Sequence, residues 1–148
     1  MTVVEALEMR DGRKLVFTNG VFDILHAGHV TYLADAAALG DLLIVGMNTD
    51  ASVRRLGKAP DRPINSLTDR MIVLEALRMV AGVVAFPEDT PENLVEILRP
   101  EVHVKGGDYN EDQLPEAKIV RSYGGEVVIL PTLAGRSTTG ILRRLRED

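Results

Sequence analysis

The sequence predicts an α/β domain built on a mainly parallel sheet of five strands. Short apolar runs alternate along the chain with segments of helical periodicity, a pattern typical of parallel strands joined by right-handed helical crossovers. A hydrophobic content of 45% over 148 residues suffices for one well-buried core. We therefore expect a single domain over residues 1–148, in which residues 1–13 form a short helix or extension that ends at the turn dipeptide Asp11-Gly12.

Five segments carry the features of strands. Residues 42–48 form a continuous apolar run, as expected of a strand that is covered on both faces of a sheet. The other four are shorter apolar segments that lie between helical segments and turns. In chain order, the predicted strands are residues 14–18, 42–48, 83–86, 102–105 and 127–130.

Helix starts are indicated between and after these strands. The first crossover helix opens at about Ala27. The spacing of its apolar residues predicts one buried face, formed by Val30, Leu33, Ala34, Ala37 and Ala38. Side-chain oxygens that cap helices predict further starts after Thr49, at Ser66 or Thr68, at Thr90 with Pro91 in the first turn, and at Ser137 or Thr138. One more helix is expected over residues 114–123, before Gly124-Gly125.

Composition excludes several classes of protein. A net charge of −5 and an aromatic content of 4% argue against a nucleic-acid-binding surface. The absence of cysteine excludes disulfides, thiolate metal sites and a cysteine nucleophile, and fits a reducing cytoplasm. No apolar run approaches the length that spans a bilayer, and residues 1–14 lack the apolar region of a signal peptide. We expect a cytoplasmic protein with neither nucleic acid nor membrane as a partner.

The segment after the first predicted strand is the strongest candidate for a binding site. His26 and His29 stand three positions apart at the predicted start of a helix. Unpaired N–H groups and the positive end of the helix dipole attract anions there, phosphate above all. Gly28 between the histidines allows a ligand to approach the backbone closely. A strand, a tight turn and a helix start with two imidazoles therefore predict a phosphate site.

Other polar segments follow the second, fourth and fifth strands. They comprise residues 58–62, 105–109 and 135–139. Ligands of open α/β sheets bind outside the carboxyl ends of the strands, so these segments are expected to meet at one edge. The chain has no G-x-G-x-x-G motif, and Gly57-Lys58 lacks the remaining residues of a P-loop. Whatever holds phosphate here differs from both of these common motifs.

Two motifs carry a resemblance to a known family. Residues Thr18 to Asp23, followed by His26-Ala27-Gly28-His29, resemble the HxGH signature of the cytidylyltransferase-like nucleotidyltransferases. Ser137-Thr138-Thr139 with Arg143 or Arg144 resembles the second signature of that family, ISSTxxR, with Arg136 where an apolar residue is usual. The resemblance implies a Rossmann-like three-layer sandwich. It also implies transfer of a nucleoside monophosphate to a phosphorylated substrate, with release of pyrophosphate.

The resemblance also assigns roles to residues. The expected catalytic residues are His26 and His29, which act at the α-phosphate, and Lys58, which neutralises the β- and γ-phosphates. The expected nucleotide-binding residues are Asn19, Gly20, Val21, Phe22, Gly28, Arg136, Ser137, Thr138 and Thr139. The expected substrate-site or loop residues are Asp23, Arg62, Arg70, Lys105, Gly107, Asp108 and Tyr109. Three roles stay open for Asp23: orienting a histidine, reaching an ion through water, or bonding turn N–H groups.

The substrate is suggested by the branch of the family that the chain resembles. Residues 105–109 and 136–139 are most similar to the enzymes that adenylylate D-glycero-β-D-manno-heptose 1-phosphate. This implies ATP and a sugar 1-phosphate as substrates, with Mg²⁺ held by phosphate oxygens and water rather than directly by side chains. Similar enzymes are commonly homodimers, and many are fused to a sugar kinase. With 148 residues, the chain is expected to be the stand-alone form or an excised domain, linked in function to a separate heptose kinase.

Two other functions stay open. A cytidylyltransferase acting on glycerol 3-phosphate or a related alcohol phosphate would share the HxGH motif, the Lys58 loop and the Ser-Thr run. A nucleotide-binding sensor would bind ATP without releasing pyrophosphate. The two histidines argue against a sensor, because a sensor has no need of donors to a transition state. His103 alternates with Val102 and Val104 in a predicted strand, and for it we expect a structural role.

Overall fold

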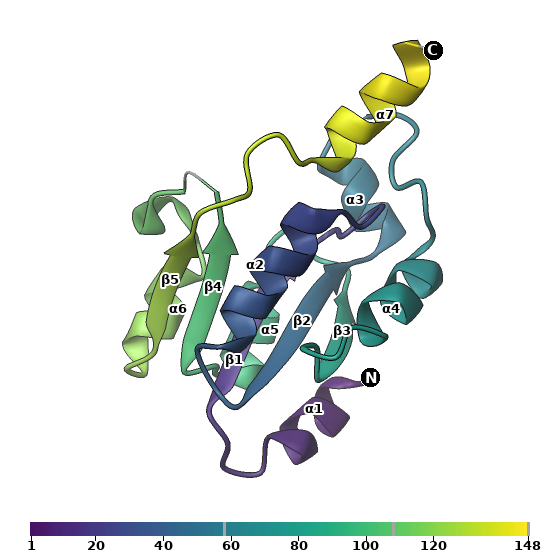
Figure 1. The fold of residues 1–148 in the computed structure, drawn as a ribbon. Coiled ribbons are helices and arrows are strands. Elements are labelled where there is room, and N and C mark those ends of the chain that lie inside the picture. Colours follow the sequence, from purple (N-terminus) through teal and green to yellow (C-terminus); the bar gives the residue numbers. More distant parts are fainter. Residues whose placement is uncertain (58, 108, 148) are drawn as a thin grey trace.

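The computed structural model describes residues 1–57, 59–107 and 109–147, and it contains one five-stranded, all-parallel sheet (Figure 1). The strands lie in the order β3-β2-β1-β4-β5. Their bounds are β1 Leu15–Gly20, β2 Leu42–Asn48, β3 Gly82–Phe86, β4 Val102–Gly106 and β5 Glu126–Leu130. The chain extends the sheet outward from β1 in one direction and then in the other. The order of the strands therefore reverses between β1 and β4, which is where such sheets form a crevice.

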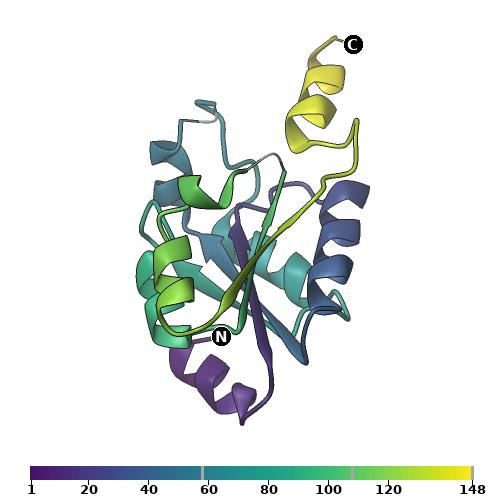
Figure 2. The same cartoon turned by 90° about the vertical axis from the view of Figure 1, so that its left-hand side faces the viewer.

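Helices cover both faces of this sheet (Figure 2). One face packs against α1, α5 and α6, and the other against α2 and α4. The helices are α1 Val3–Arg10, α2 Ala27–Ala37, α3 Asp50–Arg55, α4 Leu67–Glu75, α5 Glu92–Leu98, α6 Ala117–Ser122 and α7 Thr138–Glu147, and a 3-10 turn, η1, spans Glu111–Gln113. The expected three-layer α/β sandwich is confirmed.

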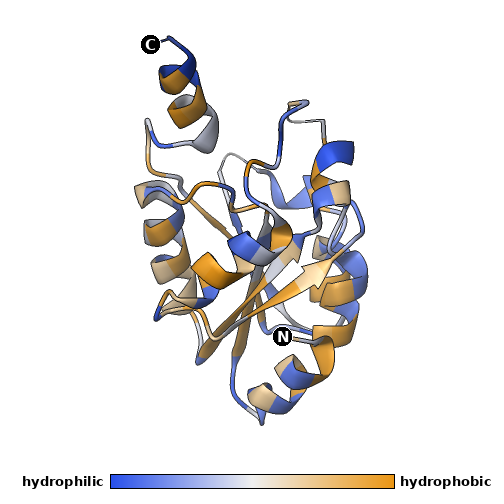
Figure 3. Ribbon diagram, turned by 90° about the vertical axis from the view of Figure 1, so that its right-hand side faces the viewer, coloured by the Kyte–Doolittle hydropathy of each residue, from blue (hydrophilic) through white to orange (hydrophobic). Residues whose placement is uncertain are grey.

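Alternation along the central strands divides the core into two apolar clusters. Leu15 and Phe17 of β1 pack with α1, α5 and α6, whereas Val16 between them packs with α2 and α4. Every residue of β2 is buried, which explains why its sequence is a continuous apolar run. Figure 3 shows this hydrophobic colouring concentrated in the sheet and on the inner sides of the helices. Within the described residues, no helix is both long enough and apolar enough to cross a membrane.

The predicted start of α2 is confirmed. Its predicted buried face is correct for Leu33 and for half-buried Ala37 and wrong for the other three residues. The helix begins at Ala27, and Leu33 and Ala36 are its fully buried residues. Val30 is 37% exposed, and Ala34 and Ala38 are exposed as well. The physical reason is that alanine fits either side of a helix, so a run of alanines does not fix the rotation of the helix about its axis.

The other helix starts agree in part with the prediction. The side chains of Thr49 and Ser66 cap α3 and α4 as expected. The predicted cap at Thr90 is wrong, because α5 begins at Glu92 after Pro91 and has no side-chain cap. The helix expected over residues 114–123 is shorter, running from Ala117 to Ser122 after the 3-10 turn.

Arg70 fixes the loops at the carboxyl edge of the sheet. Its side chain is fully buried and donates to the carbonyls of Val21 (2.9 Å), Asn48 (3.0 Å) and Asn65 (3.1 Å). It also pairs with Asp50 at 2.7 Å. These partners follow β1, end β2, begin α3 and precede α4. One guanidinium therefore ties four segments together.

Replacing Arg70 with Met should lower the free energy of unfolding by about 3–5 kcal/mol, because it leaves buried acceptors and a partly buried carboxylate without their cation. Urea denaturation measures the change. Arg55→Met is the matched control, since Arg55 also lies on a helix and pairs with an aspartate, Asp89, but is half exposed. We expect the control to lose less than about 1 kcal/mol. Equal losses in the two variants would contradict the role given to Arg70.

Candidate active site

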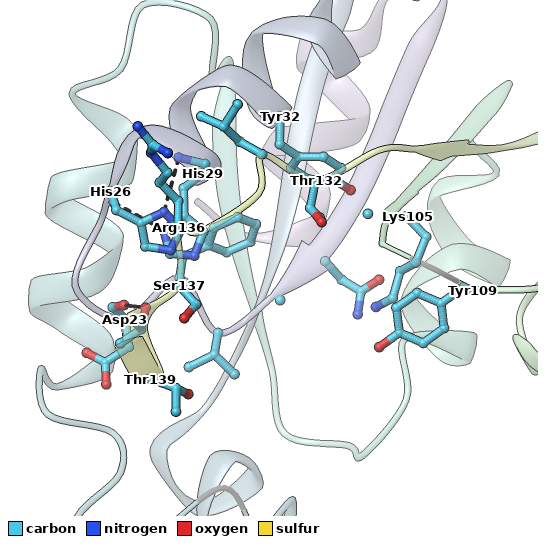
Figure 4. Close-up of a pocket in the computed structure, with 18 of the residues that line it drawn as sticks. Asp23, His26, His29, Tyr32, Lys105, Tyr109, Thr132, Arg136, Ser137 and Thr139 are labelled. Atoms are coloured by element: carbon cyan, nitrogen blue, oxygen red, sulfur yellow. Dashed lines mark hydrogen bonds between the residues drawn. The ribbon is translucent and has the colours of Figure 1, made fainter. Parts of the chain in front are cut away.

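A pocket of about 370 Å³ opens at the carboxyl edge of the sheet, where the order of the strands reverses (Figure 4). It draws residues from the ends of β1, β4 and β5 and from the starts of α2 and α7. Its lining residues are Asn19, Gly20, Val21, Phe22, Asp23, His26, Gly28, His29, Tyr32, Arg62, Lys105, Gly106, Tyr109, Thr132, Leu133, Arg136, Ser137, Thr138 and Thr139. Segments predicted to meet at this edge therefore do so.

Two histidines form the cap of α2. His26 is the N-cap residue, and its Nδ1 accepts a hydrogen bond from the backbone N–H of Gly28 at 3.1 Å. His29 reaches back, and its Nδ1 accepts from the backbone N–H of His26 at 3.4 Å. This is a capping box in which imidazoles replace the usual hydroxyl and carboxylate.

The cap determines the tautomer of both rings. Because each Nδ1 accepts a hydrogen bond, the proton of each neutral imidazole is assigned to Nε2. The two rings stack with centroids 3.9 Å apart, and Phe22 packs against His29 with centroids 5.4 Å apart. Burial lowers the pKa of His26 below its ordinary value of 6.5. His26 therefore presents a neutral imidazole N–H group at pH 7.

Gly28 is required by the packing around the histidines. A Cβ at this position would lie 2.9 Å from the His26 ring and 3.3 Å from Cβ of Arg136. Figure 4 shows Arg136 beside both histidines on the same side of the pocket. A side chain at residue 28 would therefore displace the His26 imidazole. The glycine therefore makes room for the His26 ring.

Asp23 lies under the pocket and binds a neighbouring loop. It is 1% exposed, and its carboxylate accepts from the N–H groups of Ile64 (2.6 Å) and Asn65 (3.0 Å) and from Nε of Arg62 (3.1 Å). Of the three roles left open, this arrangement fits the bonding of backbone N–H groups, although they belong to residues 64 and 65 rather than to its own turn. Both carboxylate oxygens are occupied by these donors.

The start of α7 forms the second helix terminus at the pocket. Ser137 caps it by accepting from the N–H of Gly140 at 2.9 Å. Thr138 was expected to hold phosphate with its side chain, but its buried hydroxyl donates to the carbonyl of Asp23 at 2.5 Å. That hydroxyl hydrogen is therefore committed within the protein. Exposed Arg136 and Thr139 remain at the mouth of the pocket.

The opposite side of the pocket is formed by β4 and the segment after it. Figure 4 shows Lys105 and Tyr109 together there, away from the histidines. Nζ of Lys105 lies 5.6 Å from the centroid of the Tyr109 ring, and Tyr109 is 48% exposed. Gly107 has a φ of +104°, which side chains rarely adopt, and its N–H donates to Leu130 at 3.0 Å. The glycine therefore turns the chain so that Tyr109 reaches the pocket.

Some predicted site residues lie elsewhere. Arg70 contacts the protein rather than the pocket, and Gly107 shapes the chain without lining it. Lys58 and Asp108 lie outside the described residues. Two smaller hollows adjoin the pocket along α7: one includes Arg144 with His26, and the other includes Arg143 with Arg62.

Four lining residues are absent from the predicted site residues: Tyr32, Thr132, Leu133 and Gly106, of which Gly106 lies within the predicted polar segment 105–109. Tyr32 lies one helical turn after His29 and thus on the same side of α2, a spacing that could have identified it. Thr132 and Leu133 follow the fifth strand directly, at the edge where ligands bind. Their position after a strand was the available signal.

The fold and the site together define a class of protein. A parallel sheet with a reversal of strand order, two helix starts and two capping imidazoles at one pocket is suited to binding the phosphates of a nucleotide. Residues 17–141 match the family model described as cytidylyltransferase-like. The chain belongs to this family.

Close relatives and a solved structure agree with this assignment. The chain is 57% identical over 135 residues to a D-beta-D-heptose 1-phosphate adenylyltransferase from Bordetella bronchiseptica, covering 91% of this chain and 83% of the relative. It is 59% identical over 137 residues to the bifunctional protein HldE of Azotobacter vinelandii, covering 93% of this chain but only 29% of the relative. A lipopolysaccharide core biosynthesis protein from Thermoplasma volcanium has a TM-score of 0.68 at 29% identity, over 82% of this chain and 98% of that one.

The lowered pKa of His26 makes a testable prediction. Protonation of this group opposes folding, because its pKa is lower in the folded chain than the unfolded value of 6.5. The free energy of unfolding should therefore fall as the pH decreases from 7 through 6.5 toward the folded pKa, and His26→Gln should fall less steeply. An NMR titration of the three histidines, with His26→Gln to assign the signal, measures the pKa directly. A value at or above 6.5 would contradict the burial argument.

Proposed function

We propose that the protein transfers AMP from ATP to D-glycero-β-D-manno-heptose 1-phosphate, giving ADP-heptose and pyrophosphate. The observation that carries this proposal is the capping pair of His26 and His29 in a pocket between two helix starts, in a chain 57% identical to a named heptose 1-phosphate adenylyltransferase. The pair supplies imidazole N–H donors where an α-phosphate would gain charge. The choice of adenine as the base and of heptose as the sugar rests on the name of this relative.

The reaction needs no side-chain nucleophile. A phosphate oxygen of the sugar 1-phosphate attacks the α-phosphorus of ATP and forms a new P–O bond, while the bond from that phosphorus to the bridging oxygen of pyrophosphate breaks and its electron pair leaves with pyrophosphate. His26 and His29 donate to the oxygens that gain charge. Arg136, Thr139 and the N–H groups at the start of α7 bind the phosphates that leave.

The opposite side of the pocket suits the acceptor. We assign the sugar phosphate to the side with Lys105 and Tyr109, where a cation and an exposed aromatic ring lie together. Lys105 contributes charge, and the ring supports the apolar face of a sugar. Lys58 would neutralise the β- and γ-phosphates. Residues 62–65, which follow it in the sequence, are bound by the Asp23 carboxylate.

Mg²⁺ is expected to accompany ATP. No group of three or more His, Asp or Glu side chains that could hold a metal ion occurs among the described residues. Among the described residues, Asp23 is the one carboxylate that lines the pocket, and it already accepts three protein donors. The donors present therefore fit an ion carried mainly by phosphate oxygens and water. Bound there, Mg²⁺ would neutralise charge on the phosphates.

The remaining partners are also proposals. We infer a homodimer, which light scattering tests. A separate heptose kinase would supply the sugar 1-phosphate in the cytoplasm. The chain spans less than a third of the length of the bifunctional relatives it matches. The proposed supply of sugar 1-phosphate does not require the kinase to bind this protein, because a small substrate can diffuse between enzymes.

Pyrophosphate release tests the proposed function. ATP and CTP are each combined with heptose 1-phosphate and with glycerol 3-phosphate, in the presence of Mg²⁺. We expect release only with ATP and the heptose. Release with CTP and glycerol 3-phosphate would replace the substrates and retain the mechanism. ATP binding by calorimetry without release in any of the four mixtures would support a nucleotide-binding sensor instead.

His29→Ala should lower kcat by about 10²–10³-fold, the scale for one donor to a transition state. His29 also closes the cap of α2, so circular dichroism and the melting temperature must accompany the assay. Lys118→Ala, a change of one exposed side chain on α6, is the control that should leave kcat unchanged. Near-normal turnover of folded His29→Ala would remove this histidine from the mechanism.

A further inference from the structure

Tyr32 lines the pocket and has no place in the mechanism above. It lies on α2 one turn after His29, so both side chains project from the same side of the helix. Figure 4 shows Tyr32 between His29 and Thr132, at the back of the pocket. The question is what this side chain contributes to a site whose phosphate-binding groups are already accounted for.

The hydroxyl of Tyr32 joins α2 to the two central strands. It donates to the carbonyl of Val104 at 3.1 Å and lies 2.5 Å from Oγ1 of Thr18. Thr18 and Val104 are register partners on β1 and β4. These are the two strands between which the order of the sheet reverses. One phenol therefore connects the helix that carries the histidines to both strands beneath the pocket.

The ring of Tyr32 packs closely against the end of β4. A Cβ on Gly106 would lie 3.0 Å from Cε2 of Tyr32 and 3.4 Å from Thr132. Only glycine at residue 106 lets the ring pack this closely against the end of β4. The side chain is thus fixed at both ends, by packing at the ring edge and by hydrogen bonds at the oxygen.

Tyr32 is unsuited to acid or base catalysis. Its hydroxyl donates to Val104 and lies within hydrogen-bond distance of Thr18, so it is engaged inside the protein. Burial raises the pKa of Tyr32 to about 12, against the weaker opposing effect of the Thr18 hydrogen bond. The phenol therefore keeps its proton at neutral pH.

We propose that Tyr32 is a positioning residue that fixes the start of α2 on β1 and β4 and so sets the place of the His26 and His29 imidazoles in the pocket. This inference rests on the proposed function, since it concerns donors to the α-phosphate. Leu33 and Ala36 of the same helix supply apolar packing, which resists sliding along the sheet less than directed hydrogen bonds do.

The test is Tyr32→Phe, which keeps the ring and removes only the hydroxyl. A displaced transition-state donor lowers kcat with little change in KM. We expect kcat to fall about 10–100-fold, as displacements near 1 Å do, with KM for both substrates within about twofold of wild type. The melting temperature should fall by about 3–5 °C for the lost hydrogen bonding.

Tyr123→Phe is a matched control. Tyr123 donates its hydroxyl to the carbonyl of Pro100 at 2.8 Å, its ring edge would lie 2.9 Å from a Cβ on Gly125, and its pKa is also raised to about 12. It lies beside the amino ends of β4 and β5, opposite the pocket. We expect a comparable or smaller fall in melting temperature and unchanged kcat. Equal kcat in Tyr32→Phe and Tyr123→Phe, or a change confined to KM, would overturn the proposal.

A second readout does not depend on turnover. The chain has three histidines, so their imidazole C–H signals are easily followed by NMR. Because Tyr32→Phe keeps the aromatic ring, a change in the His26 and His29 signals reports a movement of the helix start rather than a lost ring current. We expect the chemical shifts of those signals to change in Tyr32→Phe and to stay as in the wild-type protein in Tyr123→Phe. Unshifted signals would overturn the positioning role, whereas shifted signals in a protein that is inactive on heptose 1-phosphate would contradict only the proposed function.

Discussion

The site depends on one buried carboxylate, that of Asp23. Phe22 and Ile24 on either side of it both have φ of 51°, a region that residues with side chains seldom adopt. Such a turn persists only where its surroundings hold it. Asp23 provides that support by accepting from residues 62, 64 and 65 with its carboxylate and from Thr138 with its carbonyl. The turn at residues 22–24, the loop at residues 62–65 and the start of α7 are thereby held together at one edge of the sheet.

Much of the fold could be predicted because the relevant signals are local. The apolar run of β2 matches residues 42–48 without error, and the polar Thr49 and Ser66 mark the helix starts that follow. Where a signal was weak, the prediction failed. The alanines of α2 do not distinguish a buried side of the helix from an exposed one. Pro91 directly precedes α5, and the Thr90 side chain does not cap that helix.

The site was predictable in its location and in its histidines, but not in its internal bonding. His26 and His29 are three residues apart, so the sequence displays their relation. Arg70 meets Val21 across 49 residues, and Tyr32 meets Val104 across 72. Which donor finds which carbonyl over such separations is decided by the packing of the whole sheet. A charged residue expected at the substrate, Arg70, is for this reason a structural residue.

The hydrogen bond from Thr138 to Asp23 has a consequence for the order in which the protein assembles. It closes a separation of 115 residues, so it forms only after the chain has been made as far as residue 138. During synthesis, the first three strands can pair while the start of α7 is still to come. The nascent chain would therefore form its histidine turn early, whereas the two helix starts would meet at the pocket only after α7 has been made.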